Sequence, residues 1–128
     1  MKADLLRKSG RFEDALDAYE EALQRDQKDI SLWTARGTLL DVMGRYNEAG
    51  KSFEHAIGLG DAGPNVLYGK GVALLHLGKY EPAIAAFDEA LDHAPDQNGI
   101  LAMKGRALAL MGNYSEAATC FSKMSENE

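Results

Sequence analysis

Apolar residues recur along this chain with the three- and four-residue spacing of amphipathic helices. In FEDALDAYEEAL the apolar positions are Phe12, Ala15, Leu16, Tyr19 and Leu23. In LWTARGTLLDVM they are Leu32, Trp33, Leu39, Leu40 and Met43. No stretch alternates strictly between apolar and polar residues, so no strand is expected. The pattern predicts a protein built entirely of helices.

One helical phrase occurs four times, at an interval of 34 residues. Glycines at positions 10, 44, 78 and 112 open the phrases GRFEDAL, GRYNEAG, GKYEPAI and GNYSEAA. In each copy the glycine is followed by an aromatic residue, an alanine and a second aromatic at the same offsets. Glycine ends a helix at low cost because it adopts the left-handed conformation freely. Each of these glycines is therefore predicted to separate two helices.

The repeat fixes where the helices should lie. First helices are predicted near residues 2–9, 30–43, 64–77 and 98–111, and second helices near 12–25, 46–58, 80–93 and 114–125. Gly37 and Ala49 fall one on each helix of a pair, where small residues permit a close approach. A larger side chain there should cost about 1–3 kcal/mol through overpacking. Trp33 is assigned to a core column of the repeat, with stacking on a ligand as the alternative.

These columns resemble the tetratricopeptide repeat, a 34-residue helix–turn–helix unit. The matching positions include Trp33, Gly37, Leu40, Ala49, Phe53 and Ala56, and in the next copy Leu67, Gly71, Leu74, Ala83, Phe87, Ala90 and Pro95. The resemblance implies an all-α fold, an α-solenoid of antiparallel helix pairs in a right-handed superhelix with about eight helices. It also implies one domain over residues 1–128, with repeats near 1–29, 30–63, 64–97 and 98–128. The first copy lacks its first five positions, so the chain is expected to be an excerpt of a longer array.

Members of this family bind peptides in a concave groove lined by the first helices. The groove columns map onto Thr34, Thr38, Asp41, Tyr68, Val72, Leu75, His76, Met103, Arg106 and Leu110. An apolar centre with a polar rim is typical of a surface that binds a peptide. The resemblance thus implies a non-catalytic scaffold that binds a peptide or helix of a partner protein. The alternative for Leu75 and Leu110 is that they only complete the packing between repeats.

A second interpretation is self-association through terminal repeats. The last predicted helix carries an apolar face made of Tyr114, Ala118, Phe121 and Met124. Exposed apolar faces favour association because burial removes them from water. A more distant alternative is RNA binding, since the pentatricopeptide repeat is similar in form. The net charge of −6 argues against a nucleic-acid partner.

Some relatives hold the carboxylate tail of heat-shock chaperones with lysines, arginines and asparagines at fixed positions. Those positions map here onto Asp4, Ala35, Asn65 and Gly69, or onto Thr34, Thr38, Gly69, Gly99 and Met103. Neither set supplies the cations that two carboxylates need. No chaperone-tail clamp is therefore expected.

The stretch GLGDAGP, residues 58–64, has the glycine spacing of a dinucleotide-binding turn. That turn requires a strand before it, whereas a helix is predicted here. We interpret it as a link between repeats, in which Pro64 opens the next helix. His55, His76 and His93 form no i, i+4 pair for a metal, and no serine has a nucleophile-elbow context. We expect no enzyme activity, metal or cofactor.

Charge and cysteine content add the remaining expectations. Lys2, Arg36, Lys70 and Lys104 form a basic column that should pair with nearby acids, with a row of anion sites as the alternative. Cys120 is the single cysteine; it is interpreted as a small packing residue and suits a reducing, cytoplasmic compartment. No apolar run is long enough to span a membrane.

Overall fold

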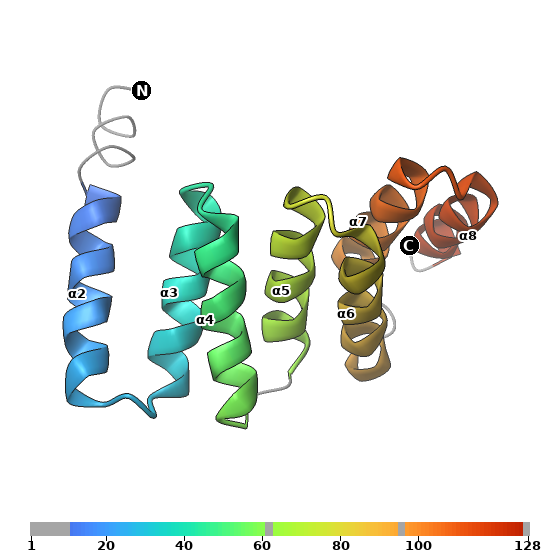
Figure 1. The fold of residues 1–128 in the computed structure, drawn as a ribbon. Coiled ribbons are helices and arrows are strands. Elements are labelled where there is room, and N and C mark those ends of the chain that lie inside the picture. The colour runs from blue at the N-terminus through green and yellow to red at the C-terminus, as the bar shows by residue number, and fades with distance from the viewer. Residues whose placement is uncertain (1–10, 61–62, 95–96, 127–128) are drawn as a thin grey trace. The chain divides into compact units, whose positions relative to one another are not determined.

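The computed structural model describes residues 11–60, 63–94 and 97–126, and these form seven α-helices and no strand (Figure 1). The helices are α2 (Phe12–Arg25), α3 (Ile30–Val42), α4 (Tyr46–Gly58), α5 (Pro64–His76), α6 (Tyr80–His93), α7 (Asn98–Leu110) and α8 (Tyr114–Glu126). Every one was predicted, and every boundary is within one residue of the prediction. The expected helix near residues 2–9 and the turn glycine Gly10 lie outside the described residues.

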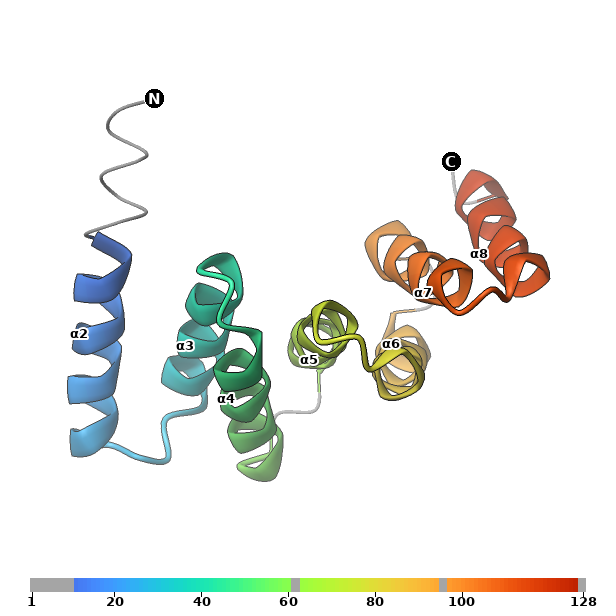
Figure 2. The ribbon, with the colours of Figure 1, turned by 45° about the horizontal axis from the view of Figure 1, so that its top comes forward.

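The chain forms two compact units, Met1–Asp61 and Ala62–Glu128, called here the first and second units. In the first unit, α3 packs against both α2 and α4. In the second, α6 packs on α5 and α7, α7 packs on α8, and α5 also touches α7. Figures 1 and 2 show α3–α4, α5–α6 and α7–α8 as pairs joined by tight turns. The fold is an all-α solenoid of helix pairs, while the single domain stays a prediction.

The turns inside the pairs are built by glycine in the left-handed conformation. Gly44 has a φ of 82°, and the N–H of Arg45 after it donates to the carbonyl of Leu40 at 2.9 Å. This bond satisfies a carbonyl that the helix end would leave unpaired. Gly78 and Gly112 have φ values of 79° and 87° and sit in equivalent turns. The prediction that these glycines end the first helices is confirmed.

The link GLGDAGP follows a helix. The helix α4 ends at Gly58, Gly60 has a φ of 120°, and Pro64 is the first residue of α5. Asp61 and Ala62 lie outside the described residues. Because α4 occupies the place of the strand that a dinucleotide turn requires, the link is a connection between repeats.

Small residues in the first helices make room for aromatic rings of the second helices. A Cβ atom placed on the glycine of each pair would lie 2.5–2.8 Å from a phenylalanine ring carbon, which is too close for real atoms. Ala49 and Ala83 are fully buried, as the repeat predicted. The group that the glycine accommodates is thus a ring, and the pairs are Gly37 with Phe53, Gly71 with Phe87, and Gly105 with Phe121.

Candidate protein-interaction surface

The predicted groove residues of α3 lie in the first unit. The hydroxyl of Thr34 donates to the carbonyl of Ile30, and that of Thr38 donates to the carbonyl of Thr34, both at 3.0 Å. Each hydroxyl therefore has a partner within its own helix, and each threonine also has a methyl group to offer for contact. Asp41, near the end of α3, is half-buried.

The predicted groove residues of α5 differ in their exposure. Tyr68 and Val72 are half-buried, and the Tyr68 ring packs at 6.1 Å from the ring of Phe87. His76 is exposed, and its Nδ1 lies 2.9 Å from the carbonyl oxygen of Val72. Leu75 is buried, with 5% of its surface exposed. Leu75 therefore contributes to the interior of the second unit, in line with the alternative stated for it above.

On α7, the predicted groove residues reach progressively further into solvent. Met103 is half-buried and Arg106 is exposed. Leu110 has 54% of its surface exposed. An exposed leucine at the end of a helix does not complete the packing between repeats, so Leu110 is available for contact with another molecule.

A pocket of about 290 Å³ lies between the starts of α5 and α7. Tyr68 is the one predicted groove residue that lines it. The other lining residues are Pro64, Asn65, Gln97, Gly99 and Ile100. None of these side chains is charged, so the pocket offers amides, a phenol and apolar surface. Such groups recognise uncharged polar and apolar ligand atoms.

Sequence reasoning did not assign Asn65 and Gln97 to the groove. The repeat columns place Asn65 only at a chaperone-clamp position, and Gln97 lies one residue before the predicted helix. Their positions in the sequence could have indicated this role, because residues at the start of a helix lie beside backbone N–H groups that have no partner within the helix. Gln97 is the N-cap residue of α7 and makes no side-chain cap bond there.

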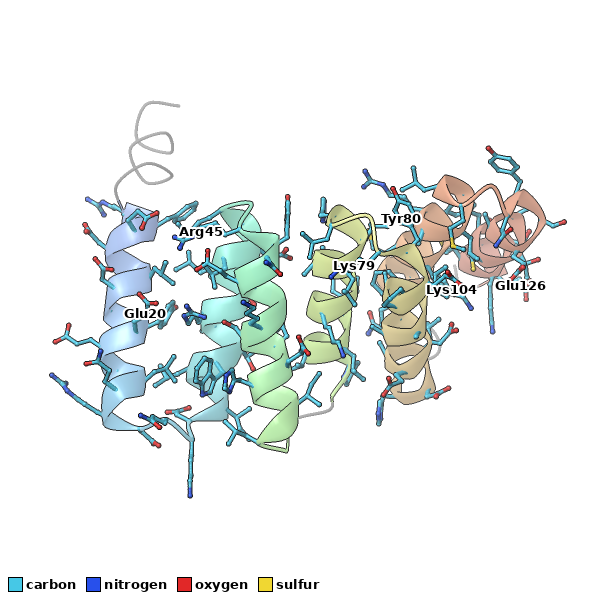
Figure 3. All side chains as sticks on the ribbon, in the orientation of Figure 1. Glu20, Arg45, Lys79, Tyr80, Lys104 and Glu126 are labelled. Carbon is cyan, nitrogen blue, oxygen red and sulfur yellow. The ribbon has the colours of Figure 1, made fainter. Side chains whose placement is uncertain are left out.

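Two members of the basic column, Arg36 and Lys104, form ion pairs between consecutive helices, whereas Lys70 makes no salt bridge with any described residue. In the second unit, Lys104 of α7 lies 2.7 Å from the carboxylate of Asp88 on α6. Figure 3 labels Lys104. Burial lowers the pKa of Lys104, but the hydrogen bond to Asp88 and nearby charges outweigh it, so the pKa is raised.

Burial raises the pKa of Cys120, which is 7% exposed and confirmed as a packing residue.

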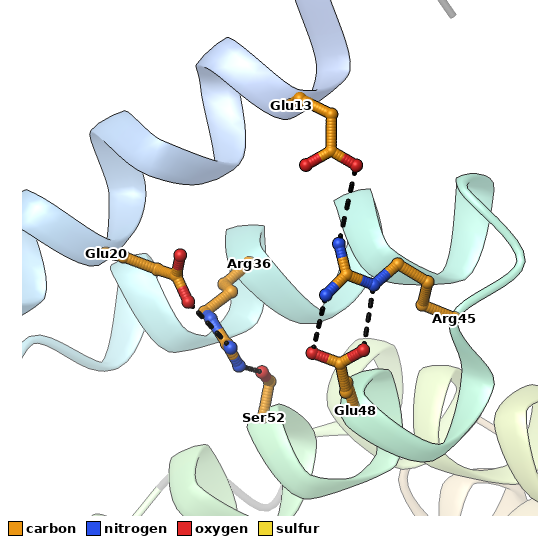
Figure 4. Close-up of polar contacts among 6 residues, drawn as sticks. All are labelled: Glu13, Glu20, Arg36, Arg45, Glu48 and Ser52. Carbon is orange, nitrogen blue, oxygen red and sulfur yellow. Dashed lines mark hydrogen bonds and ion pairs between the residues drawn. The ribbon is translucent and has the colours of Figure 1, made fainter. Parts of the chain in front are cut away.

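The equivalent arginine of the first unit joins three helices. The guanidinium of Arg36 on α3 donates to Glu20 of α2 at 3.1 Å and to the hydroxyl of Ser52 on α4 at 2.5 Å (Figure 4). Only 15% of the Arg36 side chain is exposed. The predicted pairing with nearby acids is confirmed for Arg36 and Lys104, and it accounts for both cations without bound anions. Lys2 lies outside the described residues.

A second arginine ties α2 to the turn between α3 and α4. Arg45 donates two hydrogen bonds to Glu48, at 2.8 and 2.9 Å, and lies 3.5 Å from Glu13 (Figure 4). The hydrogen bonds from Arg45 lower the pKa of Glu48, and those same bonds raise the pKa of Arg45. Both side chains are partly exposed, so this pair positions the elements more than it stabilises them.

The last helix presents the predicted self-association residues with unequal exposure. Tyr114 is 71% exposed and Phe121 44%. Ala118 is exposed and Met124 is half-buried. Leu110 and Met111 lie exposed beside the start of this helix. An apolar surface is therefore present at the predicted place.

Over residues 11–60, 63–94 and 97–126, no three His, Cys, Asp or Glu side chains come together as a metal site. His55, His76 and His93 are separately exposed on α4, α5 and α6. Within the same ranges, no helix is long and apolar enough to cross a membrane.

The repeat columns, the helix pairs and the glycine turns together decide the family. Family models described as tetratricopeptide repeat match residues 34–99, 74–128 and 1–39. The first of these alone covers just over half of the chain. The chain belongs to the tetratricopeptide repeat family. No curated protein matches it.

Solved structures of tetratricopeptide proteins share the fold. One, "Crystal structure of MamA", has a TM-score of 0.89 at 22% identity, covering 98% of this chain and 73% of that one. MamA from Desulfovibrio magneticus RS-1 has a TM-score of 0.88 at 20% identity, covering 95% and 69%. A third, "Crystal structure of YrrB: a TPR protein with an unusual peptide-binding site", has a TM-score of 0.82 at 26% identity, covering 98% and 65%. The family and these neighbours support a protein-interaction scaffold.

Proposed function

We propose that this tetratricopeptide chain is a non-catalytic scaffold that binds an extended peptide or a helix of a partner protein along its first helices. The observation that carries the proposal is the pocket between α5 and α7, because it lies on two first helices and contains a predicted groove residue, Tyr68. The structural neighbour YrrB is described as having a peptide-binding site, which supports the same class of ligand here.

The lining of this pocket indicates what part of a peptide it would hold. The side-chain amides of Asn65 and Gln97 each offer a donor and an acceptor, which match the C=O and N–H of a peptide bond. Tyr68 and Ile100 supply the apolar walls. A pocket of about 290 Å³ is at the small end of ligand sites. It therefore fits one uncharged side chain and the adjacent backbone.

The remaining groove residues would extend this contact. Met103 and Leu110 on α7 and Val72 on α5 supply apolar surface, while His76 and Arg106 supply polar atoms that set the register of the peptide. Thr34, Thr38 and Asp41 of α3 are proposed as a contact surface of the first unit by itself. A cytoplasmic location is also part of it, since the single cysteine can form no internal disulfide.

The test is selection from a displayed library of random 12-residue peptides, followed by calorimetry of the selected peptides. The variant Tyr68→Ala should weaken binding at least tenfold, and Asn65→Ala should also weaken it. Tyr80→Ala is the matched control, because Tyr80 is a half-buried tyrosine on α6 away from the pocket. If selected peptides bind both pocket variants as tightly as the parent, the proposal is wrong.

Self-association through the last repeat is a second candidate, favoured by the exposure of Tyr114 and Phe121. Burial of such surface contributes roughly 25 cal/mol per Å². Met124→Glu is the better probe, because Phe121 also contacts the glycine of its own helix pair. Light scattering should show a dimer or larger species that this variant dissociates. A parent chain that stays monomeric at high concentration excludes this candidate.

A further inference from the structure

A second, larger pocket of about 510 Å³ lies in the first unit, and no predicted groove residue lines it. Side chains from three helices line it, and the ones that matter here are Glu20, Leu23, Trp33, Arg36, Lys51 and His55. Leu23 and Glu20 come from α2, and Lys51 and His55 from α4, so two second helices form its walls. Its volume is within the range of about 300–1,000 Å³ that ligand sites occupy.

The apolar part of this pocket is an ordered aromatic pair. The rings of Trp33 and His55 stack with centroids 4.2 Å apart and an angle of 10° between their planes. The indole N–H of Trp33 donates to the carbonyl of Gln27 at 2.8 Å, which fixes the ring. Leu23 of α2 lies beside it. The sequence predicted Trp33 as a core residue, but it is only half-buried and part of its ring reaches the pocket.

The basic side chains of this pocket differ in whether they have a partner. Arg36 is occupied, because Glu20 and Ser52 accept its hydrogen bonds. Lys51 and His55, one helical turn apart on α4, are both exposed. Among the described residues, Lys51 makes no salt bridge or hydrogen bond, and His55 makes only the stacking contact with Trp33. Two donors on one helix face are thus available beside apolar surface.

We propose that this pocket binds a partner peptide segment in which a glutamate or aspartate side chain stands next to an apolar one. The carboxylate accepts hydrogen bonds from Lys51 and His55, and the apolar neighbour packs on Trp33 and Leu23. This arrangement matches the lining, since Arg36 already holds Glu20, while Lys51 makes no direct ion pair and acts on Glu48 only from a distance.

An internal acidic side chain fits this pocket better than a chain terminus does. Proteins capture a terminal carboxylate with free backbone N–H groups. Apart from Gln27, in the turn between α2 and α3, the lining residues lie within α2, α3 and α4, and the backbone N–H of Trp33 already donates to the carbonyl of Asp29. The side chains of Lys51 and His55 are therefore the donors here. This site is independent of the α5–α7 pocket, and either proposal can fail while the other stands.

The experiment uses Trp33 as the reporter, because it is the single tryptophan of the chain. The probes are three acetylated and amidated pentapeptides with one Glu between two leucines, two valines or two phenylalanines, together with their Gln counterparts. Blocking both termini leaves the Glu side chain as the sole carboxylate. At least one Glu peptide should change the Trp33 fluorescence saturably, and its Gln counterpart should bind at least tenfold more weakly.

Two charge reversals sharpen the test. Lys51→Glu should weaken the Glu peptide at least tenfold, whereas Lys79→Glu, which changes the net charge equally at an exposed site before α6, should not. Both lysines are exposed, so folding is retained, and circular dichroism checks this. The proposal is overturned if no Glu peptide gives saturable binding, if Gln peptides bind equally well, or if Lys51→Glu has no more effect than Lys79→Glu. Binding that Tyr68→Ala abolishes would also overturn it, by placing the peptide in the other pocket.

Discussion

The helices α6 and α8 occupy the same place in successive repeats but have different surroundings. Phe87 of α6 has no exposed surface, whereas Phe121, its equivalent in α8, is 44% exposed. Tyr80 is half-buried, while Tyr114 is 71% exposed. The alanines that face the partner helix, Ala83 and Ala117, are buried in both.

The difference arises from neighbours and not from the helix pair itself. The helix α6 packs against α5 within its pair and against α7 of the following repeat. Among the described helices, α8 packs against α7 alone. One column of the repeat can therefore be core in one copy and surface in the next. The same comparison predicts that one kind of substitution should lower the stability by different amounts in the two helix pairs.

The largest effect is expected from truncation of the two rings. Phe87→Ala should lower the free energy of unfolding by about 3–5 kcal/mol, the usual cost for a buried phenylalanine. Phe121→Ala should lower it by less than half as much, because its ring is already in part hydrated. Urea denaturation of both variants checks this. Equal losses would show that α8 is covered in solution.

The glycines under these rings should respond in the same order. A Cβ on Gly71 would lie 2.5 Å from a ring carbon of Phe87, and one on Gly105 would lie 2.8 Å from Phe121. Gly71→Ala should cost about 1–2 kcal/mol, since Phe87 is enclosed and cannot move aside. In Gly105→Ala the half-exposed ring can shift, so the gain in helix propensity of about 1 kcal/mol should offset the strain. Thermal unfolding compares the two, and a larger loss at Gly105 would contradict the comparison.

The turn glycines provide a pair in which no difference is expected. Gly78 and Gly112 both have positive φ, at 79° and 87°, and a Cβ on either would meet no atom within 4 Å. Gly78→Ala and Gly112→Ala should each cost about 1–2 kcal/mol from the left-handed backbone alone. Denaturation midpoints should therefore shift alike. A cost confined to Gly78 would mean that neighbours, and not the local backbone, determine the turn.

A smaller effect is expected from the ion pair between α6 and α7. Asp88→Asn should cost less than about 1 kcal/mol, because the pair is partly exposed. The pKa of Lys104 is raised above its ordinary 10.5, so the stabilisation is complete below pH 10.5 and is lost as pH rises through the raised value. The parent and the variant should thus converge in stability at high pH. Divergence there would show that Asp88 acts through something other than Lys104.

The residue of α8 that corresponds to Asp88 of α6 is Ser122, which is not acidic. Ser122→Asp should leave the stability unchanged within about 0.5 kcal/mol, since this is an exposed surface position. A stabilisation that depends on protein concentration would indicate that a basic residue of a second chain reaches this helix.

Most of the fold could be predicted because a local signal marks each helix boundary. Gly44, Gly78 and Gly112 recur in one register, and each turn depends on backbone conformation within a few residues. These local signals did not predict that Leu75 is buried while Leu110 is exposed. The two leucines were assigned to neighbouring groove columns, but Leu110 shares its column with Val42 and His76, which are also exposed, so the helix face separates it from Leu75.

The candidate sites were less predictable, because each needs side chains from several helices. Tyr68 was assigned from its column, but Gln97, which lines the same pocket, belongs to the segment before α7. The pairing of Arg36 with an acid followed from the basic column. The stacking of Trp33 on His55 depends on how α3 and α4 cross, and no periodicity in one helix reports that crossing.

The glycine turns also bear on how the chain reaches its folded state. Each turn connects two helices of 13 or 14 residues, so the contacts inside a pair join residues that are near one another in sequence. Closing such short loops costs little chain entropy, and low contact order is associated with rapid folding. Any of the three described pairs can therefore nucleate structure, and growth then proceeds to the next repeat. The folding rate should consequently be insensitive to which pair carries a destabilising substitution.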